Sequence, residues 1–153
     1  MYKRQALPPV IGWTIATGTI TIEPIILFLI IFVWTPSHFW ALSLYKSGDY
    51  KKAKIPMLPV IAGTKTTKTN ILVYSFAMLP VVIAPYYFEF ESLLYLVTAL
   101  VMTLYYNYLC LELFKAKVVK FSNKIARKVF IYSIFYLFFV YLILLIDNAR
   151  SLF

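Results

Sequence analysis

The sequence predicts an all-α protein, a polytopic bundle of membrane-spanning helices, on three observations. Hydrophobic residues make up 62% of its 153 residues and the mean hydropathy is +0.80, both higher than in a soluble domain. The apolar residues gather in four runs of about 20 residues, the length that a helix needs to cross a bilayer. The basic residues fall in alternate connections between these runs, as the positive-inside rule requires of a membrane protein.

The four apolar runs give the expected spans in chain order. They are Ile22–Tyr45, Asn70–Phe88, Ser92–Phe114 and Val129–Ile146. A shorter apolar stub, Leu7–Ile20, precedes them and is interrupted by prolines and glycines. We interpret the stub as the end of a helix whose beginning is missing, because alone it is too short to span. The sequence therefore predicts about four full transmembrane helices plus a partial one, with TKTTKTN before the second span as a solvated loop ending in capping residues.

The basic residues predict an orientation. They gather in the connections Lys46–Lys68 and Lys115–Lys128 and at Lys3 and Arg4 before the stub. If the stub and the four spans alternate in direction, 14 of the 15 lysines and arginines fall on one side, Arg150 being the exception. We expect that side to be cytoplasmic. Without an arginine- and serine-rich transit segment, the inner (plasma) membrane of a bacterium is favoured over a mitochondrial membrane.

The net charge of +9 is explained by this topology. No nucleic-acid partner is expected, because the basic residues flank apolar spans and form no basic domain of their own. The single cysteine, Cys110, excludes an internal disulfide and a cysteine metal cluster.

The stretch WTPSHFWALSLYKSGDY, beginning at Trp34, concentrates polar and aromatic residues at the end of the first span. It holds the only histidine, His38, and two of the three tryptophans. If the helix continued to Asp49, then Trp34, His38, Tyr45 and Asp49 would share one face and line an elongated pocket. The letters SGD also resemble a helix end, which would place Asp49 in a loop instead.

Three kinds of chemistry suit this stretch, and the residues alone leave them open. A carboxylate among lysines can hold Mg²⁺ against a diphosphate. Aromatic rings at a membrane edge can flank a lipid chain or a developing cation. A histidine deep in a span can hydrogen-bond a substrate or ligate haem iron. The structural alternatives are a lysine-rich cytoplasmic loop and an aromatic belt at the bilayer surface.

Four blocks carry a resemblance to a known family. PPVIGW, WTPSHFWALSLYKSGDY, KKAKIPMLPV and RKVFIYSIFYLFFVYLILLID together resemble the protoheme IX farnesyltransferase (haem O synthase) family of membrane-embedded aromatic prenyltransferases. The resemblance implies a fold of roughly nine spanning helices, which needs far more than this chain. Residues 1–153 are therefore expected to form a single partial transmembrane domain whose amino-terminal half is missing.

The resemblance implies transfer of a farnesyl group from farnesyl diphosphate to a vinyl group of haem B, giving haem O. Mg²⁺ would stabilise the leaving diphosphate. The implied partners are the lipid bilayer, haem B, farnesyl diphosphate and a separately encoded amino-terminal half.

Site roles follow from the same resemblance. Asp49 is the expected Mg²⁺ ligand, together with carboxylates from the missing half. The expected catalytic residues are Asp49, Lys46 and Tyr50. The expected substrate-binding residues are Trp34, His38, Tyr45, Lys51 and Lys52.

Two other functions remain as alternatives. A prenyltransferase of the same superfamily acting on a quinone precursor is disfavoured by the IPMLP block and by the lack of a D-x-x-x-D repeat in the first basic loop. An inactive remnant, or a non-catalytic haem-binding membrane partner, is favoured for the isolated chain, because the family's first acidic motif is not present in it. A transporter is disfavoured because corresponding broken helices are lacking.

Overall fold

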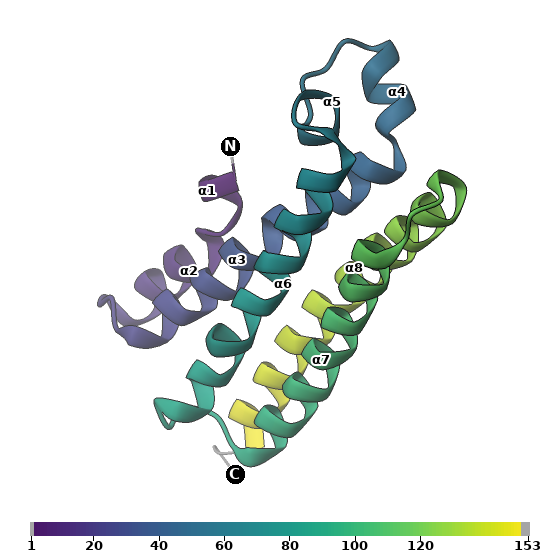
Figure 1. Ribbon diagram of the computed structural model, residues 1–153. Helices are drawn as coiled ribbons and strands as arrows, with labels where there is room; N and C mark the ends of the chain where they lie inside the picture. Colours follow the sequence, from purple (N-terminus) through teal and green to yellow (C-terminus); the bar gives the residue numbers. More distant parts are fainter. Residues whose placement is uncertain (1, 151–153) are drawn as a thin grey trace.

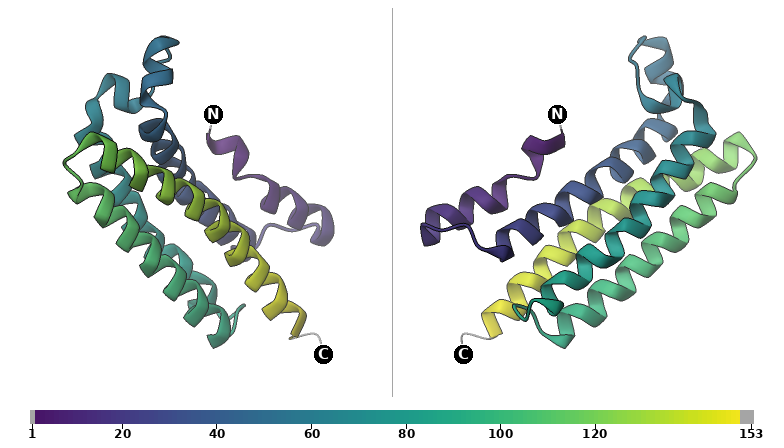
Figure 2. Two further views of the ribbon diagram at one scale, coloured as in Figure 1. Left: turned by 90° about the vertical axis from the view of Figure 1, so that its right-hand side faces the viewer. Right: turned by 60° about the vertical axis from the view of Figure 1, so that its left-hand side comes forward.

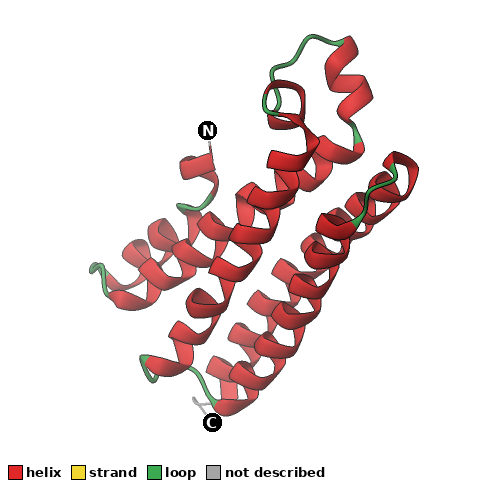
Figure 3. Cartoon of the chain, viewed as in Figure 1, coloured by secondary structure: helices red, strands yellow, loops and turns green. Residues whose placement is uncertain are grey.

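The computed structural model describes residues 2–150, and within them all regular structure is helical (Figure 3). The helices are α1 Tyr2–Gln5, α2 Pro8–Thr17, α3 Ile22–Tyr45, α4 Ser47–Lys52, α5 Leu58–Ile61, α6 Gly63–Tyr87, α7 Leu93–Lys115 and α8 Val119–Arg150. Four of them, α3, α6, α7 and α8, are long and apolar enough to cross a membrane. The predicted all-α, multi-pass class is confirmed.

The four long helices form an up-and-down bundle (Figure 1). Helix α3 packs against α6 and α8, and α7 packs against the same two helices on the other side. The helix α2 lies outside this ring and contacts α3, as the two further views show (Figure 2). The helices α4 and α5 lie at the same end of the bundle as the α7–α8 connection. We call this the lysine-rich end, because it carries the basic segments 46–68 and 115–128.

Helix boundaries agree with the sequence for α3 and closely for α7, but α6 and α8 begin earlier than predicted. Helix α6 begins at Gly63, whose φ of +82° permits the sharp entry into the helix. Thr67 donates a hydrogen bond of 2.8 Å from its hydroxyl to the Gly63 carbonyl oxygen, so this polar segment is satisfied within the helix. The prediction that TKTTKTN is a loop is therefore wrong.

Helix α3 ends at Tyr45, and the alternative of one continuous helix from Trp34 to Asp49 is also wrong. Lys46 separates α3 from α4 with non-helical backbone angles, φ −100° and ψ 18°. Asp49 therefore belongs to the short helix α4 rather than to a loop. The letters SGD are the start of α4 and not a helix end, so that interpretation is wrong as well. The stub is helical as α2, and its 10 residues are about half of what a span needs.

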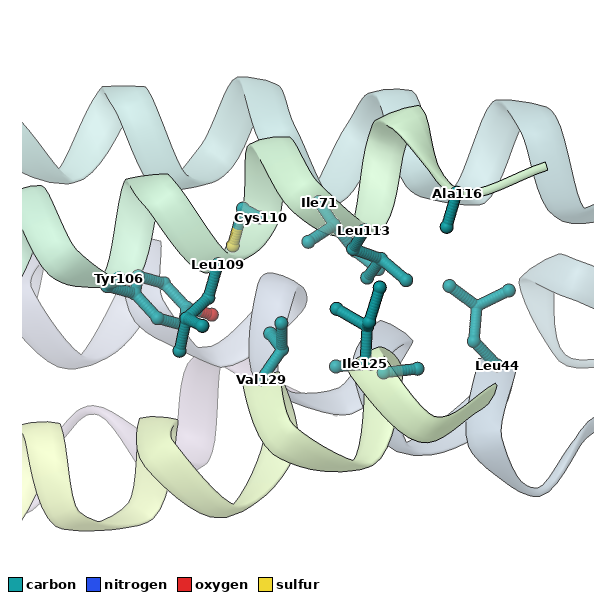
Figure 4. Close-up of a cluster of buried hydrophobic side chains, with 11 residues drawn as sticks. Leu44, Ile71, Tyr106, Leu109, Cys110, Leu113, Ala116, Ile125 and Val129 are labelled. Carbon is teal, nitrogen blue, oxygen red and sulfur yellow. The ribbon is translucent and has the colours of Figure 1, made fainter. Parts of the chain in front are cut away.

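The bundle core divides into two clusters along its length. At the lysine-rich end the buried residues include Ala41, Leu44, Ile71, Tyr106, Leu109, Cys110, Leu113, Ile125, Ala126 and Val129 (Figure 4). At the opposite end they include Ile26, Ile30, Met78, Val82, Tyr95, Ala99, Tyr136, Val140 and Leu144. The small side chains of alanine and cysteine in these clusters let the helices approach closely. Van der Waals packing then holds the helices together, because the hydrophobic effect does not drive helix association within lipid.

Tyrosine hydroxyls cross-link the bundle between the two clusters. Tyr106 Oη donates to Ser37 Oγ at 2.9 Å, joining α7 to α3. Tyr136 Oη and Thr103 Oγ1 lie 2.9 Å apart and join α8 to α7. Both pairs are buried, so each bond satisfies polar atoms that water cannot reach.

Candidate functional site

His38 lies in an aromatic cage formed by α3 and α8. Its ring stacks on Trp34 with centroids 4.3 Å apart, and the Phe130 ring lies 4.8 Å from it on the other helix. His38 Nδ1 is 2.7 Å from Ser133 Oγ, and Trp34 Nε1 donates to the Ser133 carbonyl oxygen at 3.0 Å. These contacts fix the orientation of the imidazole, which is half-buried between the helices.

An apolar groove begins beside this cage. It has a volume of about 330 Å³ and runs between α3 and α8. Its lining residues are Ile31, Trp34, Ile134, Leu137, Phe138 and Tyr141. Trp34 both lines the groove and stacks on His38, so it is the residue shared by the groove and the cage.

The lysine-rich end brings a second group of predicted residues together. Lys46 Nζ lies 3.3 Å from Asp49 Oδ2 and 5.4 Å from the centre of the Tyr45 ring. The Arg127 guanidinium, from α8, lies 5.9 Å from the same ring. Two cations therefore lie within cation–π range of the Tyr45 ring, which is a favourable contact for its electron-rich face.

Helix α4 carries the remaining predicted cations. Lys51 and Lys52 are exposed, whereas Tyr50 is half-buried. The chain then reverses through Lys54, whose φ is +54°, and Ile55 N–H donates to the Tyr50 carbonyl oxygen at 3.0 Å. The lysines thus stand at the surface of the lysine-rich end, where water or an anionic group can reach them.

A cavity lined partly by basic residues lies nearby, between the adjoining ends of α7 and α8. Its volume is about 420 Å³, and its lining residues are Glu112, Phe121, Lys124, Ile125, Arg127, Lys128 and Ile131. The sequence predicted that the cations of Lys115–Lys128 lie in a loop. Because α8 begins at Val119, helical spacing gathers them on one face beside apolar residues instead.

The predicted residues therefore form two groups rather than one pocket wall. Trp34 and His38 belong to the cage, whereas Tyr45, Lys46 and Asp49 meet at the lysine-rich end. Sequence reasoning missed Phe130, Ser133 and Arg127. Ser133 carried a usable signal, since a lone serine hydroxyl within the long apolar run of α8 requires a partner.

The described residues do not form a Mg²⁺ site by themselves. No group of three histidine, cysteine, aspartate or glutamate side chains within residues 2–150 could hold a metal ion. The Asp49 side chain is 68% exposed and is already paired with Lys46. One carboxylate in this setting provides too few oxygen ligands for Mg²⁺.

A further cavity lies at the opposite end of the bundle, and its mostly apolar lining includes two glutamates. It measures about 570 Å³ and is lined by residues that include Trp13, Glu23, Glu91 and Tyr141. Burial, and then the neighbouring Asp147 carboxylate, raise the pKa of Glu91 to about 8.

Comparison with known proteins identifies the family. The model of the UbiA prenyltransferase family matches residues 5–142. The chain belongs to the UbiA prenyltransferase family. The matched region takes in both the His38 cage and the lysine-rich end.

Curated relatives within the UbiA prenyltransferase family are named protoheme IX farnesyltransferase. That from Pelagibacter ubique is 66% identical over 94% of this chain and 47% of its own length. That from Parvibaculum lavamentivorans is 43% identical over 96% of this chain and 46% of its own length. That from Rickettsia bellii is 45% identical over 91% of this chain and 45% of its own length. The chain thus spans about half the length of the curated relatives it matches. No solved structure matches the chain.

Proposed function

We propose that the chain is part of a protoheme IX farnesyltransferase, which joins farnesyl to a vinyl group of haem B and gives haem O. The observation that carries the proposal is the 66% identity, over 94% of the chain, to a relative of that name. In the reaction the C–O bond to diphosphate breaks and a C–C bond to the vinyl carbon forms. Water then adds to the remaining carbocation and releases a proton, which leaves a hydroxyl group on the product. The chain would supply one part of a single transmembrane domain, with the rest of the fold completing the site.

The lysine-rich end is the proposed diphosphate end. Lys46, Lys51 and Lys52 would contact the phosphate oxygens, and their charges would stabilise the negative charge that grows as diphosphate leaves. Tyr50, on the same short helix, would position the departing group. The Lys46–Asp49 contact of 3.3 Å keeps these groups together before substrate arrives.

The cage and the apolar groove are the proposed binding region for the porphyrin and the isoprenoid chain. Trp34 and His38 offer stacked rings beside a groove of about 330 Å³. Tyr45 lies closer to the diphosphate end, where its ring face would stabilise an allylic cation. This arrangement separates the apolar part of the substrates from the charged leaving group.

Mg²⁺ enters the proposal only as an ion shared with the rest of the fold. Asp49 is this chain's candidate ligand, and the other carboxylates would come from an amino-terminal half. Bound Mg²⁺ would supply Lewis-acid stabilisation of the leaving diphosphate.

The proposed setting is the inner membrane of a bacterium, with the segments Lys46–Lys68 and Lys115–Lys128 in the cytoplasm. The support is the charge asymmetry together with the position of both segments at one end of the bundle. Farnesyl diphosphate would then reach the lysine-rich end from the water phase.

The test is the extraction of haems from membranes that contain this chain alone, the amino-terminal half of a relative alone, or both. We expect haem O only from membranes containing both, since the metal site needs carboxylates from each. Haem O from the chain alone would contradict the shared metal site. No haem O from the pair, with both chains present in the membrane, would contradict the transferase proposal and favour a non-catalytic haem-binding partner or a remnant.

A further inference from the structure

Two hollows follow one another along the boundary between α7 and α8, which lie side by side (Figure 2). The first is the cavity of about 420 Å³ at the lysine-rich end. The second has a volume of about 230 Å³ and is lined by Tyr105, Leu109, Lys128, Ile131, Tyr132 and Phe135. Lys128 and Ile131 line both hollows, so the two form one continuous surface, which we call the α7–α8 groove.

Helical spacing explains why charge gives way to apolar surface along this groove. One face of α8 carries, at steps of four, three and four residues, Lys124, Lys128, Ile131 and Phe135. The cations occupy the turns nearest the lysine-rich end, and the apolar side chains occupy the turns that follow. At about 1.5 Å per residue, this face extends on the order of 16 Å. A charged end followed by an apolar stretch fits an amphiphile better than a soluble ion.

The cations of the groove are available to an anion. Lys124 and Lys128 are exposed, and neither forms an ion pair or a side-chain hydrogen bond with another residue of the described range 2–150. Arg127 adds a third positive charge to the lining, although its guanidinium also contacts the Tyr45 ring. These three cations outnumber the single carboxylate of the lining, Glu112, so the cavity favours a ligand with net negative charge.

The apolar part of the groove faces outward from the bundle. Tyr105, Ile131 and Phe135 are 43%, 41% and 55% exposed, although α7 and α8 are long and apolar enough to cross a membrane. In a bilayer such side chains meet lipid rather than water. Phospholipids are the most concentrated amphiphiles there, so mass action favours a phospholipid over a scarce solute.

Glu112 narrows the choice of headgroup. Its carboxylate lines the cavity beside the cations. An ionised carboxylate accepts hydrogen bonds and donates none, so hydroxyl groups on the ligand would match it. A headgroup that combines one negatively charged phosphate with free hydroxyl groups satisfies the cations and the carboxylate together. Phosphatidylglycerol has such a headgroup.

We propose that the α7–α8 groove is a binding site for an anionic phospholipid, with phosphatidylglycerol as the expected ligand. The phosphate lies in the cavity beside Lys124 and Lys128. The headgroup hydroxyls donate to Glu112, and an acyl chain lies along Ile131 and Phe135. Binding is noncovalent and anchors the first turns of α8 at the bilayer surface. The inference requires a chain that lies in a membrane, and it does not depend on transferase activity.

Lipid affinity is measured by native mass spectrometry of the full chain, titrated with lipid in detergent. We expect phosphatidylglycerol to bind roughly tenfold more tightly than phosphatidylcholine or phosphatidylethanolamine, and the double change Lys124→Gln with Lys128→Gln to remove this preference. The matched control, Lys65→Gln with Lys117→Gln, makes the same charge change at two exposed lysines outside the groove and should keep the preference. Equal losses in both double variants, with helical circular dichroism retained, would overturn the site.

The headgroup is tested by a second lipid and by soluble competitors. Phosphatidic acid has the phosphate without the hydroxyl groups, so the unaltered chain should bind phosphatidylglycerol more tightly, and Glu112→Gln should reduce the difference. An unchanged difference would overturn the role of Glu112. Glycerol phosphate and inorganic diphosphate should not displace the lipid, because they lack an acyl chain. Displacement by either would overturn the lipid proposal and assign the cavity to a soluble phosphate.

Photocrosslinking locates the lipid without any substitution. Phosphatidylglycerol with a diazirine on one acyl chain, in nanodiscs that contain the full chain, should label Tyr105 and Phe135 more strongly than the matching phosphatidylcholine does. Equal labelling by the two lipids would overturn the site. Loss of this labelling when the amino-terminal half of a relative is added would also overturn it, and would assign the groove to the contact between the halves. Haem O is not measured in these experiments, so failure of the lipid site and failure of the proposed function are distinguishable.

Discussion

At the scale of single residues, the exposed cations lie apart from the aromatic cage around His38. The cations stand on the short helix α4 and at the start of α8, where water reaches them, whereas His38 is held by rings and a buried hydroxyl. Exposed lysines lose little solvation when they meet a phosphate, so they can exchange substrate and product. A caged imidazole is pre-oriented instead, which suits recognition of a rigid ligand.

Lys51 and Lys52 are expected to affect diphosphate recognition. Each Lys→Ala change should raise KM for farnesyl diphosphate by roughly tenfold in the two-half enzyme, because a charge-assisted hydrogen bond is lost. Steady-state assays with labelled farnesyl diphosphate measure this. Lys65→Ala, an exposed lysine on α6, is the control. Equal KM values for Lys51→Ala and Lys65→Ala would contradict the assignment.

At the scale of elements, the connection between α6 and α7 is fastened to α8. Ser92 caps α7, with its hydroxyl accepting from Leu94 N–H at 3.1 Å and donating to Asp147 Oδ1 at 2.6 Å. The backbone N–H of Ser92 donates to Asp147 Oδ2 at 2.7 Å. The end opposite the lysines is thus closed by these hydrogen bonds between Ser92 and Asp147, which we call the polar clasp.

Removing part of this clasp should destabilise the bundle. Ser92→Ala loses the cap and one of the two bonds to Asp147, and we expect the free energy of unfolding to fall by about 1–2 kcal/mol. Denaturant titration in mixed micelles measures the change. Thr69→Ala removes only an exposed hydroxyl bond to the Lys65 carbonyl oxygen and should change stability by less than about 0.5 kcal/mol. Equal changes in the two variants would contradict the clasp.

Glu91 makes stability depend on pH. Its pKa rises from 4.5 to about 8 in the folded chain, so between these values the folded state binds more protons than the unfolded state. The stabilisation is complete below about pH 4.5 and is lost as pH rises through about 8. Melting temperatures across this range should fall with pH, and Glu91→Gln should flatten the dependence. Glu89→Gln, at an exposed neighbour, should leave it unchanged.

The elements also show what the sequence could predict. The bounds of α3 and the existence of all four spans followed from apolar run length, because lipid leaves a spanning backbone no partner outside its own helix. The starts of α6 and α8 did not follow from the sequence. The first turns of these helices are rich in lysine or threonine, a composition typical of loops, and only tertiary contacts show that they are helical. Lys68 makes such a contact, because its Nζ donates to the Ala116 carbonyl oxygen at 2.7 Å, at the end of α7.

The candidate site was predicted by residue type more than by arrangement. Trp34 and His38 are stacked, as their spacing of four residues indicated. Asp49 does not share their helix face, because α3 ends at Tyr45. Ser133 and Arg127 come from α8, far along the chain, and only the packing of α8 against α3 brings them to the site. No local pattern specifies such a pairing.

At the scale of the whole molecule, the charge asymmetry predicts a single orientation in the membrane. Glu89→Cys should react with a membrane-impermeant maleimide on intact cells, whereas Lys117→Cys should react only after the membrane is opened. Both positions are exposed. The unaltered chain is the control, because Cys110 is buried in the core. Labelling of both variants from outside would contradict the orientation.

Haem, rather than a quinone precursor, is the proposed acceptor of the farnesyl group. Purified chain and amino-terminal half, in nanodiscs with labelled farnesyl diphosphate, can be offered haem B and 4-hydroxybenzoate, a quinone precursor, at equal concentration. We expect label in the haem fraction, at the mass of haem O, and none in the aromatic acid. Label in the aromatic acid alone would contradict it and assign the chain to quinone biosynthesis.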